Sequence, residues 1–243
     1  MIPYHGTPVA VSDDQATRIL TGHHAFVSYA NMTQLSIVQE VCQSWSLDNG
    51  AFSFWQSKKS TDWNNYYEFI ESNKSPNMDF FIIPDVINGN EDDNDLLIEE
   101  MPKLKPLGLP VFHTAESLDR LERLCNQFHH IALGSSSLQN PGTEHWWNRM
   151  HEILEVICDN NGKPKVKIHG LRMLNPEIFT KIPFTSADST SVGRNTTNQY
   201  RFNGGYRPIS AWARAQVLID RIESFNSPQS WRKRPIQMQL IQL

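Results

Sequence analysis

Short apolar segments that end in a polar residue or a glycine recur along this chain, and most are separated by stretches with helical periodicity. Six of these segments have the pattern of strands: residues 45–48, 80–85, 111–113, 131–134, 166–170 and 184–188. Strands that alternate with helices and carry polar residues at their carboxyl ends are typical of a (β/α)8 barrel, whose active site forms at that end. Three of the six ends are Asp48, Asp85 and Asp188, so carboxylate chemistry is the first hypothesis.

The strand pattern predicts one α/β domain, a TIM-like barrel over residues 1–243, with one weak position. A segment at 25–30 raises the strand count to seven, and the eighth strand could be either 2–9 or 236–243. We therefore expect a barrel that is irregular at its last strand. The length suits one barrel-sized domain, and no repeat, linker or low-complexity tract indicates a second one.

The formal net charge of −4 gives no global sign of nucleic-acid binding. A polyanion would therefore have to bind to a local basic patch. Residues 189–208 are polar and aperiodic, and a loop of that length in a compact domain is usually functional or disordered. The candidate basic side chains are Arg194, Arg201 and Arg207 in that loop, then Arg214 and the triplet 232–234, which could equally be a solvated tail.

Cysteine and histidine positions match no common metal or disulfide pattern. Cys42, Cys125 and Cys158 are far apart and form no Cys-x-x-Cys pair. The histidines look scattered, with adjacent pairs only at 23–24 and 129–130, so we predict no metal and no cofactor. The amino terminus lacks a basic and apolar leader, and no stretch approaches about 18 apolar residues, which predicts a cytoplasmic protein without membrane contact.

Two aspartate motifs give the chain a family resemblance. Asp48 begins the stretch Asp-Asn-Gly-Ala-Phe-Ser directly after a strand, and Asp188 lies in Ser-Ala-Asp-Ser-Thr-Ser-Val-Gly-Arg-Asn after another. In these motifs and their order, roughly residues 20–195 resemble the tRNA-guanine transglycosylase superfamily, most of all its zinc-less or DNA-acting relatives that place 7-deazaguanines in DNA. That family is a (β/α)8 barrel with an Asp-Ser-Gly-Gly-Phe-Gln stretch after an early strand and a nucleophilic aspartate after a late one.

The resemblance implies a role for each candidate residue. Asp188 would be the nucleophile, as an exposed strand-end carboxylate, and Asp48 the general acid/base, while Asp85 and His113 would recognise the base. The other residues expected at the base are Asn49, Phe52, Leu133, Gly134, His169 and Gly170. The arginines of the 189–208 loop would contact the nucleic-acid backbone. The structural alternatives are that the aspartates cap turns and that the histidines only pack.

Two departures from the family pattern favour DNA and a changed base. The family's tRNA enzymes hold zinc in a C-terminal insertion that helps to bind tRNA, and no cysteine follows Cys158 here. Ala51 and Ser53 replace a Gly and the Gln of the first motif. We expect an enzyme that cleaves the N-glycosidic bond of a nucleobase in DNA, either excising a modified base or exchanging guanine for a free 7-deazaguanine. The alternatives are a tRNA enzyme, an enzyme on free nucleosides or nucleotides, and a non-catalytic nucleic-acid-binding barrel.

Overall fold

The computed structural model describes residues 1–87, 89–101, 106–135, 140–196, 202 and 205–232. Nine strands in this part form one sheet in which each strand is parallel to its neighbours, in the order β5-β4-β3-β2-β1-β9-β8-β7-β6. The strands are β1 (Ile2–Thr7), β2 (His24–Ser28), β3 (Ser44–Asp48), β4 (Met78–Ile82), β5 (Gly108–Leu109), β6 (Val111–His113), β7 (His130–Gly134), β8 (Lys167–Gly170) and β9 (Ser186–Ser189).

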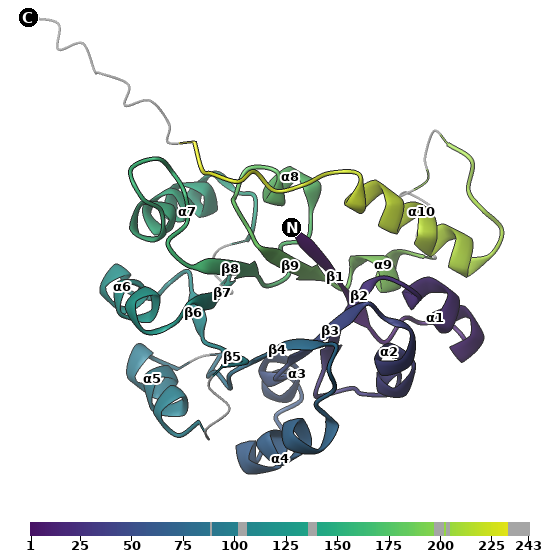
Figure 1. The fold of residues 1–243 in the computed structure, drawn as a ribbon, viewed down its shortest axis with the longest axis horizontal. Coiled ribbons are helices and arrows are strands. Elements are labelled where there is room, and N and C mark those ends of the chain that lie inside the picture. The colour runs from purple at the N-terminus through teal and green to yellow at the C-terminus, as the bar shows by residue number, and fades with distance from the viewer. Residues whose placement is uncertain (88, 102–105, 136–139, 197–201, 203–204, 233–243) are drawn as a thin grey trace, which may run out of the picture.

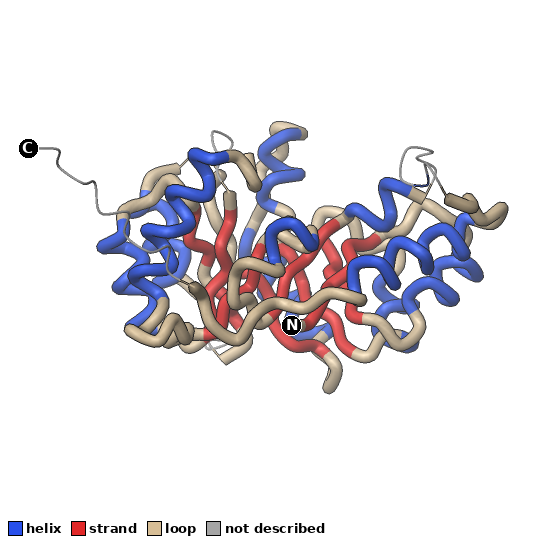
Figure 2. Tube along the Cα trace, turned by 90° about the horizontal axis from the view of Figure 1, so that it is seen from above, coloured by secondary structure: helices blue, strands red, loops and turns tan. Residues whose placement is uncertain are grey.

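Helices alternate with these strands and surround the sheet, so the molecule is a nearly closed α/β barrel of the TIM type (Figure 1). The helices are α1 (Asp13–Leu20), α2 (Leu35–Val41), α3 (Ala51–Gln56), α4 (Trp63–Asn73), α5 (Glu91–Glu99), α6 (Leu118–Gln127), α7 (Glu144–Ile157), α8 (Pro176–Phe179), α9 (Ser191–Asn195) and α10 (Ala211–Glu223). Seen from the side, the strands form the central layer and the helices flank it (Figure 2).

The barrel closes through a strand that changes partner at Pro110. The two strands on either side of this proline, β5 and β6, pair with β4 and β7 respectively. The carbonyl oxygen of Leu109 accepts the Ile83 N–H at 2.9 Å, whereas the carbonyl oxygen of Pro110 accepts the Ala132 N–H at 2.9 Å. Proline has no N–H and cannot continue a ladder on both sides. Thus β5 and β6 are two halves of one strand, and the ring has eight strand positions.

The barrel prediction is confirmed, and the weak position is resolved in favour of the amino terminus. Residues 2–7 form β1, which lies between β2 and β9. The competing segment, 236–243, lies outside the described residues. The irregularity that we expected at the last strand is instead at Pro110, in the middle of the chain. Part of the expected loop 189–208 is also helical, because α9 occupies residues 191–195.

Caps and apolar stripes explain where the helices begin and which face they bury. At the start of α7, the hydroxyl of Thr143 accepts the Trp146 backbone N–H at 3.3 Å. The side chains buried along one face of this helix are Trp146, Met150, Ile153, Leu154 and Ile157. Their spacing of three and four residues matches the helical repeat, so one stripe packs on the sheet.

Apolar side chains fill the inside of the barrel as well as the space between strands and helices. The inner cluster consists of Tyr4, Phe26, Phe80, Ile82, Leu109, Val111 and Ala132. A second and larger cluster joins the outer face of the strands to the helices. The barrel interior is therefore a packed core, and polar side chains at its carboxyl end lie on top of this core.

The chain beyond α10 crosses the amino-terminal end of the strands. Helix α10 packs beside α1 and α9, and Asn226 then accepts a hydrogen bond from the Met1 ammonium group at 2.8 Å. Further on, Trp231 is buried and its N–H donates to the Gly162 carbonyl at 2.8 Å. These contacts join the end of the described chain to both its beginning and the α7–β8 turn. Among the helices described, none has the length and apolar character needed to cross a membrane.

Candidate active site at the carboxyl end of the barrel

The three predicted aspartates lie at the same end of the barrel. Asp48 is the last residue of β3, Asp85 follows β4 by three residues, and Asp188 lies near the end of β9. The strands are parallel, so their carboxyl ends share one end of the sheet. Asp188 is the register partner of Tyr4 on β1, whose ring belongs to the inner cluster. Register partners point to the same face, so the side chain of Asp188 is also directed toward the barrel axis.

Asp48 is held by a tight turn from β3 into α3. Its Oδ2 accepts the Gly50 N–H at 3.1 Å and the Ser28 hydroxyl at 3.3 Å. Gly50 has φ +76, and a Cβ there would lie 2.8 Å from the Ala30 nitrogen, so this turn requires glycine. Within the described residues, Oδ1 of Asp48 has no hydrogen-bond partner. One oxygen of Asp48 is thus fixed in place and the other remains available.

The surroundings of Asp48 favour its protonated form. Burial, followed by the negative charges of Asp188 and Asp85, raises its pKa to about 7. The guanidinium of Arg172 and the Gly50 N–H act in the opposite direction but do not cancel this rise. A carboxyl group with such a pKa can both donate and accept a proton near neutral pH. The shift also shows that the three carboxylates are close enough to affect one another.

Asp188 is also held by one oxygen, and it is buried rather than exposed as we expected. Only 4% of the residue is accessible to solvent. Its Oδ1 accepts the Arg172 backbone N–H at 2.8 Å and lies 3.4 Å from Nε2 of His169. In the described part of the chain, Oδ2 makes no hydrogen bond. The burial follows from the packed barrel interior beneath it.

His169 lies under Asp188 and not at the barrel mouth. Its exposed fraction is 0%, and its Nδ1 is 2.8 Å from the Ser186 hydroxyl. The rings of Tyr4, Phe26 and Phe80 surround it at centroid distances of 5.0 to 6.0 Å. From this position His169 contacts Asp188 and the aromatic core, so it positions the carboxylate and does not reach a base above it.

Asp85 and His113 form an ion pair, and the Asn49 side chain donates a hydrogen bond to Asp85. Asp85 accepts the Asn49 amide at 2.7 Å on Oδ1, and Nε2 of His113 is 2.9 Å from its Oδ2. On its other side, Nδ1 of His113 is 3.2 Å from Glu116. Burial by itself would lower the pKa of His113, but the hydrogen bonds to the two carboxylates raise it to about 9. The imidazole is therefore a cation at neutral pH and donates from both ring nitrogens.

A buried arginine holds this ion pair from behind. Arg120, with an exposed fraction of 0%, donates to Glu116 at 2.5 Å, to the Val111 carbonyl at 3.0 Å and to Asp95 at 2.7 Å. The Asn94 amide also donates to Glu116, at 2.9 Å. Buried charged groups need partners, and Arg120 has them at Nε and Nη1, while Nη2 has no hydrogen-bond partner among the described residues. The network fixes the position of His113 and, through it, that of Asp85.

The predicted backbone contacts of Leu133 and Gly134 are occupied by the protein itself. The Leu133 carbonyl accepts the Leu171 N–H at 3.0 Å, and the Gly134 carbonyl accepts the Thr114 N–H at 2.9 Å. A Cβ on Gly134 would lie 3.2 Å from Val111, so a side chain there would press on the neighbouring strand. Gly170 ends β8, two residues before Arg172. These positions shape the edge of the site, but their carbonyls are already paired.

Sequence reasoning missed Arg172, whose charge acts on Asp48 and whose backbone N–H donates to Asp188. Its φ of +58 is unusual for a residue with a side chain, and its guanidinium carbon lies 4.2 Å from the centroid of the Phe52 ring. Phe52 was predicted at the base, and here it is half-buried on α3. The available signal was position: Arg172 follows a strand end in a chain with aspartates at or after three other strand ends. It forms a cation–π stack beside Asp48 and Asp188.

The predicted backbone-binding arginines are only partly described. Arg194 lies exposed on α9, six residues after Asp188, and Arg207 is exposed as well. Arg201 lies outside the described residues. Arg214 on α10 is used structurally, because it donates to the Pro208 carbonyl at 3.0 Å and to the Thr196 carbonyl. The structure thus shows that the Arg194 and Arg207 residues are exposed and that both follow the candidate nucleophile in the chain.

The arrangement offers acid–base chemistry next to a carboxylate that can attack an electrophile. Among the described residues, the one group suited to hold a metal ion is His5, His23 and Glu223, at the other end of the barrel. A comparison of the chain with protein-family models, curated proteins and solved structures finds no match. The function must therefore be argued from the geometry of this site.

Proposed function

We propose that this protein is an enzyme that cleaves the N-glycosidic bond of a nucleobase in DNA, in the cytoplasm. The observation that carries the proposal is that Asp48 and Asp188 each have one oxygen held by the protein and one without a hydrogen bond among the described residues. Cleavage of this bond develops positive charge on the sugar and negative charge on the base. Two differently held carboxyl groups can serve these two needs.

In the proposed reaction, Asp188 remains ionised and Asp48 carries the proton. The bond between C1′ and the base nitrogen breaks, its electron pair moves to the base, and Asp48 donates the proton that the departing base takes up. Oδ2 of Asp188 stabilises the cationic sugar or forms a bond to C1′. Asp48, now ionised, then removes a proton from the incoming nucleophile as the nucleophile bonds to C1′. Where Asp188 has bonded to C1′, that bond breaks in the same step and its electron pair returns to the Asp188 carboxylate, which completes the turnover.

The incoming nucleophile decides the outcome. Water would give base excision and an abasic site, whereas a free 7-deazaguanine would give base exchange. Both outcomes require the nucleotide to leave the base stack and enter the barrel mouth. The Phe52–Arg172 stack, with its guanidinium 4.2 Å from the ring centroid, offers a flat apolar and cationic surface next to the carboxylates. Asp85, oriented by Asn49 and His113, supports recognition of N–H groups on the base.

Binding of the DNA backbone is assigned to Arg194, Arg201 and Arg207. The two described members are exposed and lie on the segment just beyond Asp188. Phosphate contacts make affinity fall with salt in proportion to the number of charges neutralised. Substitution of all three by Gln should weaken DNA binding by about 10- to 100-fold and reduce the salt slope by about 2 to 3. A free nucleoside as substrate would instead leave both quantities unchanged.

The function is tested by incubating the protein with single- and double-stranded DNAs that carry different modified bases. Released bases are identified by mass spectrometry, abasic sites by strand cleavage in alkali, and exchange by incorporation of labelled 7-deazaguanine. We expect one base to be released or exchanged by the wild type and not by Asp188→Asn. Asp14→Asn, a change at an exposed carboxylate of α1, is the control. Release from free nucleosides alone, or no release from any substrate, would overturn the proposal.

A further inference from the structure

A second polar cluster lies at the amino-terminal end of the barrel, outside the candidate active site. His5 is on β1, next to the inward-facing Tyr4, and since alternate residues of a strand face opposite sides, His5 faces the helices. Glu223 is the last residue of α10, and His23 directly precedes β2. The fold thus brings together residues from the two ends of the chain.

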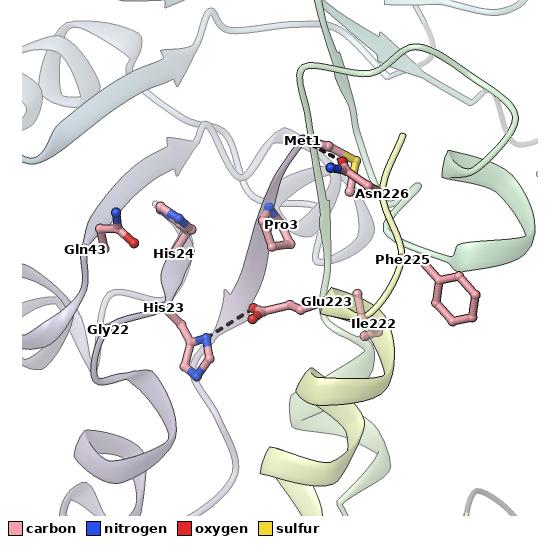
Figure 3. Close-up of a pocket in the computed structure, with 10 residues that line it drawn as sticks. All are labelled: Met1, Pro3, Gly22, His23, His24, Gln43, Ile222, Glu223, Phe225 and Asn226. Atoms are coloured by element: carbon pink, nitrogen blue, oxygen red, sulfur yellow. Dashed lines mark hydrogen bonds and ion pairs between the residues drawn. The ribbon is translucent and has the colours of Figure 1, made fainter. Parts of the chain in front are cut away.

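Both imidazoles approach the same carboxylate oxygen. Nε2 of His5 is 2.9 Å from Oε1 of Glu223, and Nδ1 of His23 is 3.1 Å from that atom. The two rings are 5.9 Å apart between centroids. Figure 3 shows His23 and Glu223 pointing toward each other at the edge of a pocket of about 250 Å³. Each of the three residues offers a ligand atom, and these atoms all lie within 4.8 Å of one another.

His5 depends on this contact for its polar interactions. Its exposed fraction is 2%, and its Nδ1 has no hydrogen-bond partner within the described residues. A buried polar group without a partner is destabilising, and among the described residues the contact at Nε2 is the only hydrogen bond of this ring. The second oxygen of Glu223, Oε2, also lacks a hydrogen bond in the described part of the chain. The cluster therefore has more ligand capacity than its internal hydrogen bonds use.

We propose that His5, His23 and Glu223 bind a divalent transition-metal ion of the zinc type, which joins α10 to β1 and β2. Two imidazoles and one carboxylate are an established zinc ligand set that keeps a fourth position open. Imidazole ligands favour zinc and its neighbours over magnesium and calcium. His23 and Glu223 are only partly buried, so side-chain rotations can bring the three atoms to the roughly 3.4 Å spacing of a tetrahedral zinc site.

The proposed site borders the pocket, because two of its three residues line that space. The residues that line the pocket include His23, Glu223, His24, Gln43, Pro3 and Asn226. A water molecule bound to the ion would occupy this space. The site lies at the amino ends of the strands, away from Asp48 and Asp188, so its expected effect is on the attachment of α10 rather than on the proposed chemistry. This inference does not depend on the proposed function.

The test uses the full chain, first stripped with a chelator and then titrated with zinc chloride. We expect one zinc per chain by elemental analysis after dialysis. At a hundredfold excess over the dissociation constant, the melting temperature should rise by about 5 °C or more, whereas magnesium should give no rise. Cobalt(II) should bind with the visible absorption of a tetrahedral site.

The variants separate ligands from bystanders. His23→Ala and Glu223→Gln should each weaken zinc binding by about 100-fold or more and abolish the zinc-dependent rise in melting temperature. His129→Ala, an exposed histidine next to the start of β7, is the matched control and should bind zinc as the wild type does. A substitution of the buried His5 could disturb the fold, so the partly exposed ligands His23 and Glu223 are substituted instead. Absence of stoichiometric zinc in the wild type, or equal zinc binding by all three variants, would leave only a structural ion pair and overturn the proposal.

Discussion

The two ends of the barrel treat their carboxylates in opposite ways. At the carboxyl end, burial and the like charges of Asp188 and Asp85 raise the pKa of Asp48 to about 7. At the amino end, burial would raise the pKa of Glu223, but hydrogen bonds from His23 and His5 lower it to about 2. Asp48 thus lies among like charges, whereas Glu223 is held by hydrogen bonds from two imidazoles. Arrangements of the first kind are typical of reactive sites, and those of the second kind stabilise folds.

The comparison gives opposite signs for the dependence of stability on pH. The raised pKa of Asp48 means that its contribution to stability is fully present below its unfolded value of 3.8 and is lost as pH rises through about 7. The lowered pKa of Glu223 means that its contribution is present above its unfolded value of 4.5 and is lost as pH falls through about 2. Near neutral pH, the ionised carboxylate of Glu223 therefore stabilises the fold. Ionisation of Asp48 in the same pH range makes the fold less stable.

The largest effect is expected from Asp188→Asn. The amide keeps the volume and can still accept the Arg172 N–H, but it cannot act as a nucleophile or balance a cationic sugar. Base release should fall by about a thousandfold or more, as measured in single-turnover assays. Loss of one negative charge should also lower the pKa of Asp48 and make the fold more stable above pH 7. A folded variant with near wild-type activity would remove the proposed role of Asp188.

Asp48→Asn should damage activity almost as much and yet stabilise the protein. Wild-type activity should fall as pH rises through about 7, because Asp48 loses the proton that it donates, and the variant should lack this limb. Its rate should be lower by about 100- to 10,000-fold. Urea unfolding above pH 8 should show a gain on the order of 2 kcal/mol, which disappears below about pH 4. A loss of stability at high pH would mean that the carboxylates at this end do not repel one another.

Glu223→Gln should have the opposite effect on stability. In chelator-containing buffer at pH 7, we expect a loss of about 1 kcal/mol, because Gln weakens the contacts that the partly exposed Glu223 carboxylate makes with His5 and His23. The loss should shrink as pH falls below 4.5. Urea unfolding across this pH range measures it, with His129→Ala as the control. An unchanged free energy of unfolding at pH 7 would show that these contacts do not hold α10 to the barrel.

The smallest effect is expected at Arg172, as a shift along the pH axis. Its charge lowers the pKa of Asp48, so Arg172→Ala should raise that pKa and move the alkaline limb of activity upward by about half a unit. Arg172→Lys keeps the charge and should move the limb less, although it loses the planar stack on Phe52. If the alkaline limb of activity lay at the same pH in both variants, the charge of Arg172 would have no effect on Asp48, and Arg172 would serve only to stack on Phe52.

The strands that carry the aspartates could be predicted because apolar runs of four to six residues are a strong local signal. Weak elements were predicted only as one of two alternatives, as β1 was, or were missed, for definable reasons. Strand β1 contains Pro3 and Gly6, which are poor strand formers, and β5 is only two residues long before Pro110. Helix α9 contains Gly193 and Asn195, which have low helix propensity.

The contacts within the site depend on tertiary structure, which no local pattern encodes. Glu223 lies 218 residues from His5 and 200 from His23, so the histidines looked scattered although the fold brings two of them together. Burial of Asp188 and His169 depends on the packed barrel interior below them. Arg172 was missed because a single exposed arginine in a turn has no periodic signature, and its position after a strand end was the only local signal. Residue types at strand ends were therefore predictable, but their partners and ionisation were not.

The change of partner at Pro110 leaves a seam in the barrel wall. Strand β4 pairs with β5, whereas β6 pairs with β7, so within the described part of the chain no backbone ladder joins β4 to β6. The hydrogen bond between Asp85, which follows β4, and His113 on β6 spans this gap. A side-chain contact therefore joins these two strand ends, whereas backbone hydrogen bonds join neighbouring strands elsewhere in the ring. A bound molecule that forms hydrogen bonds with Asp85 would compete with His113 for the carboxylate oxygens of Asp85. We therefore expect this part of the rim to be the one whose width responds to what enters the barrel.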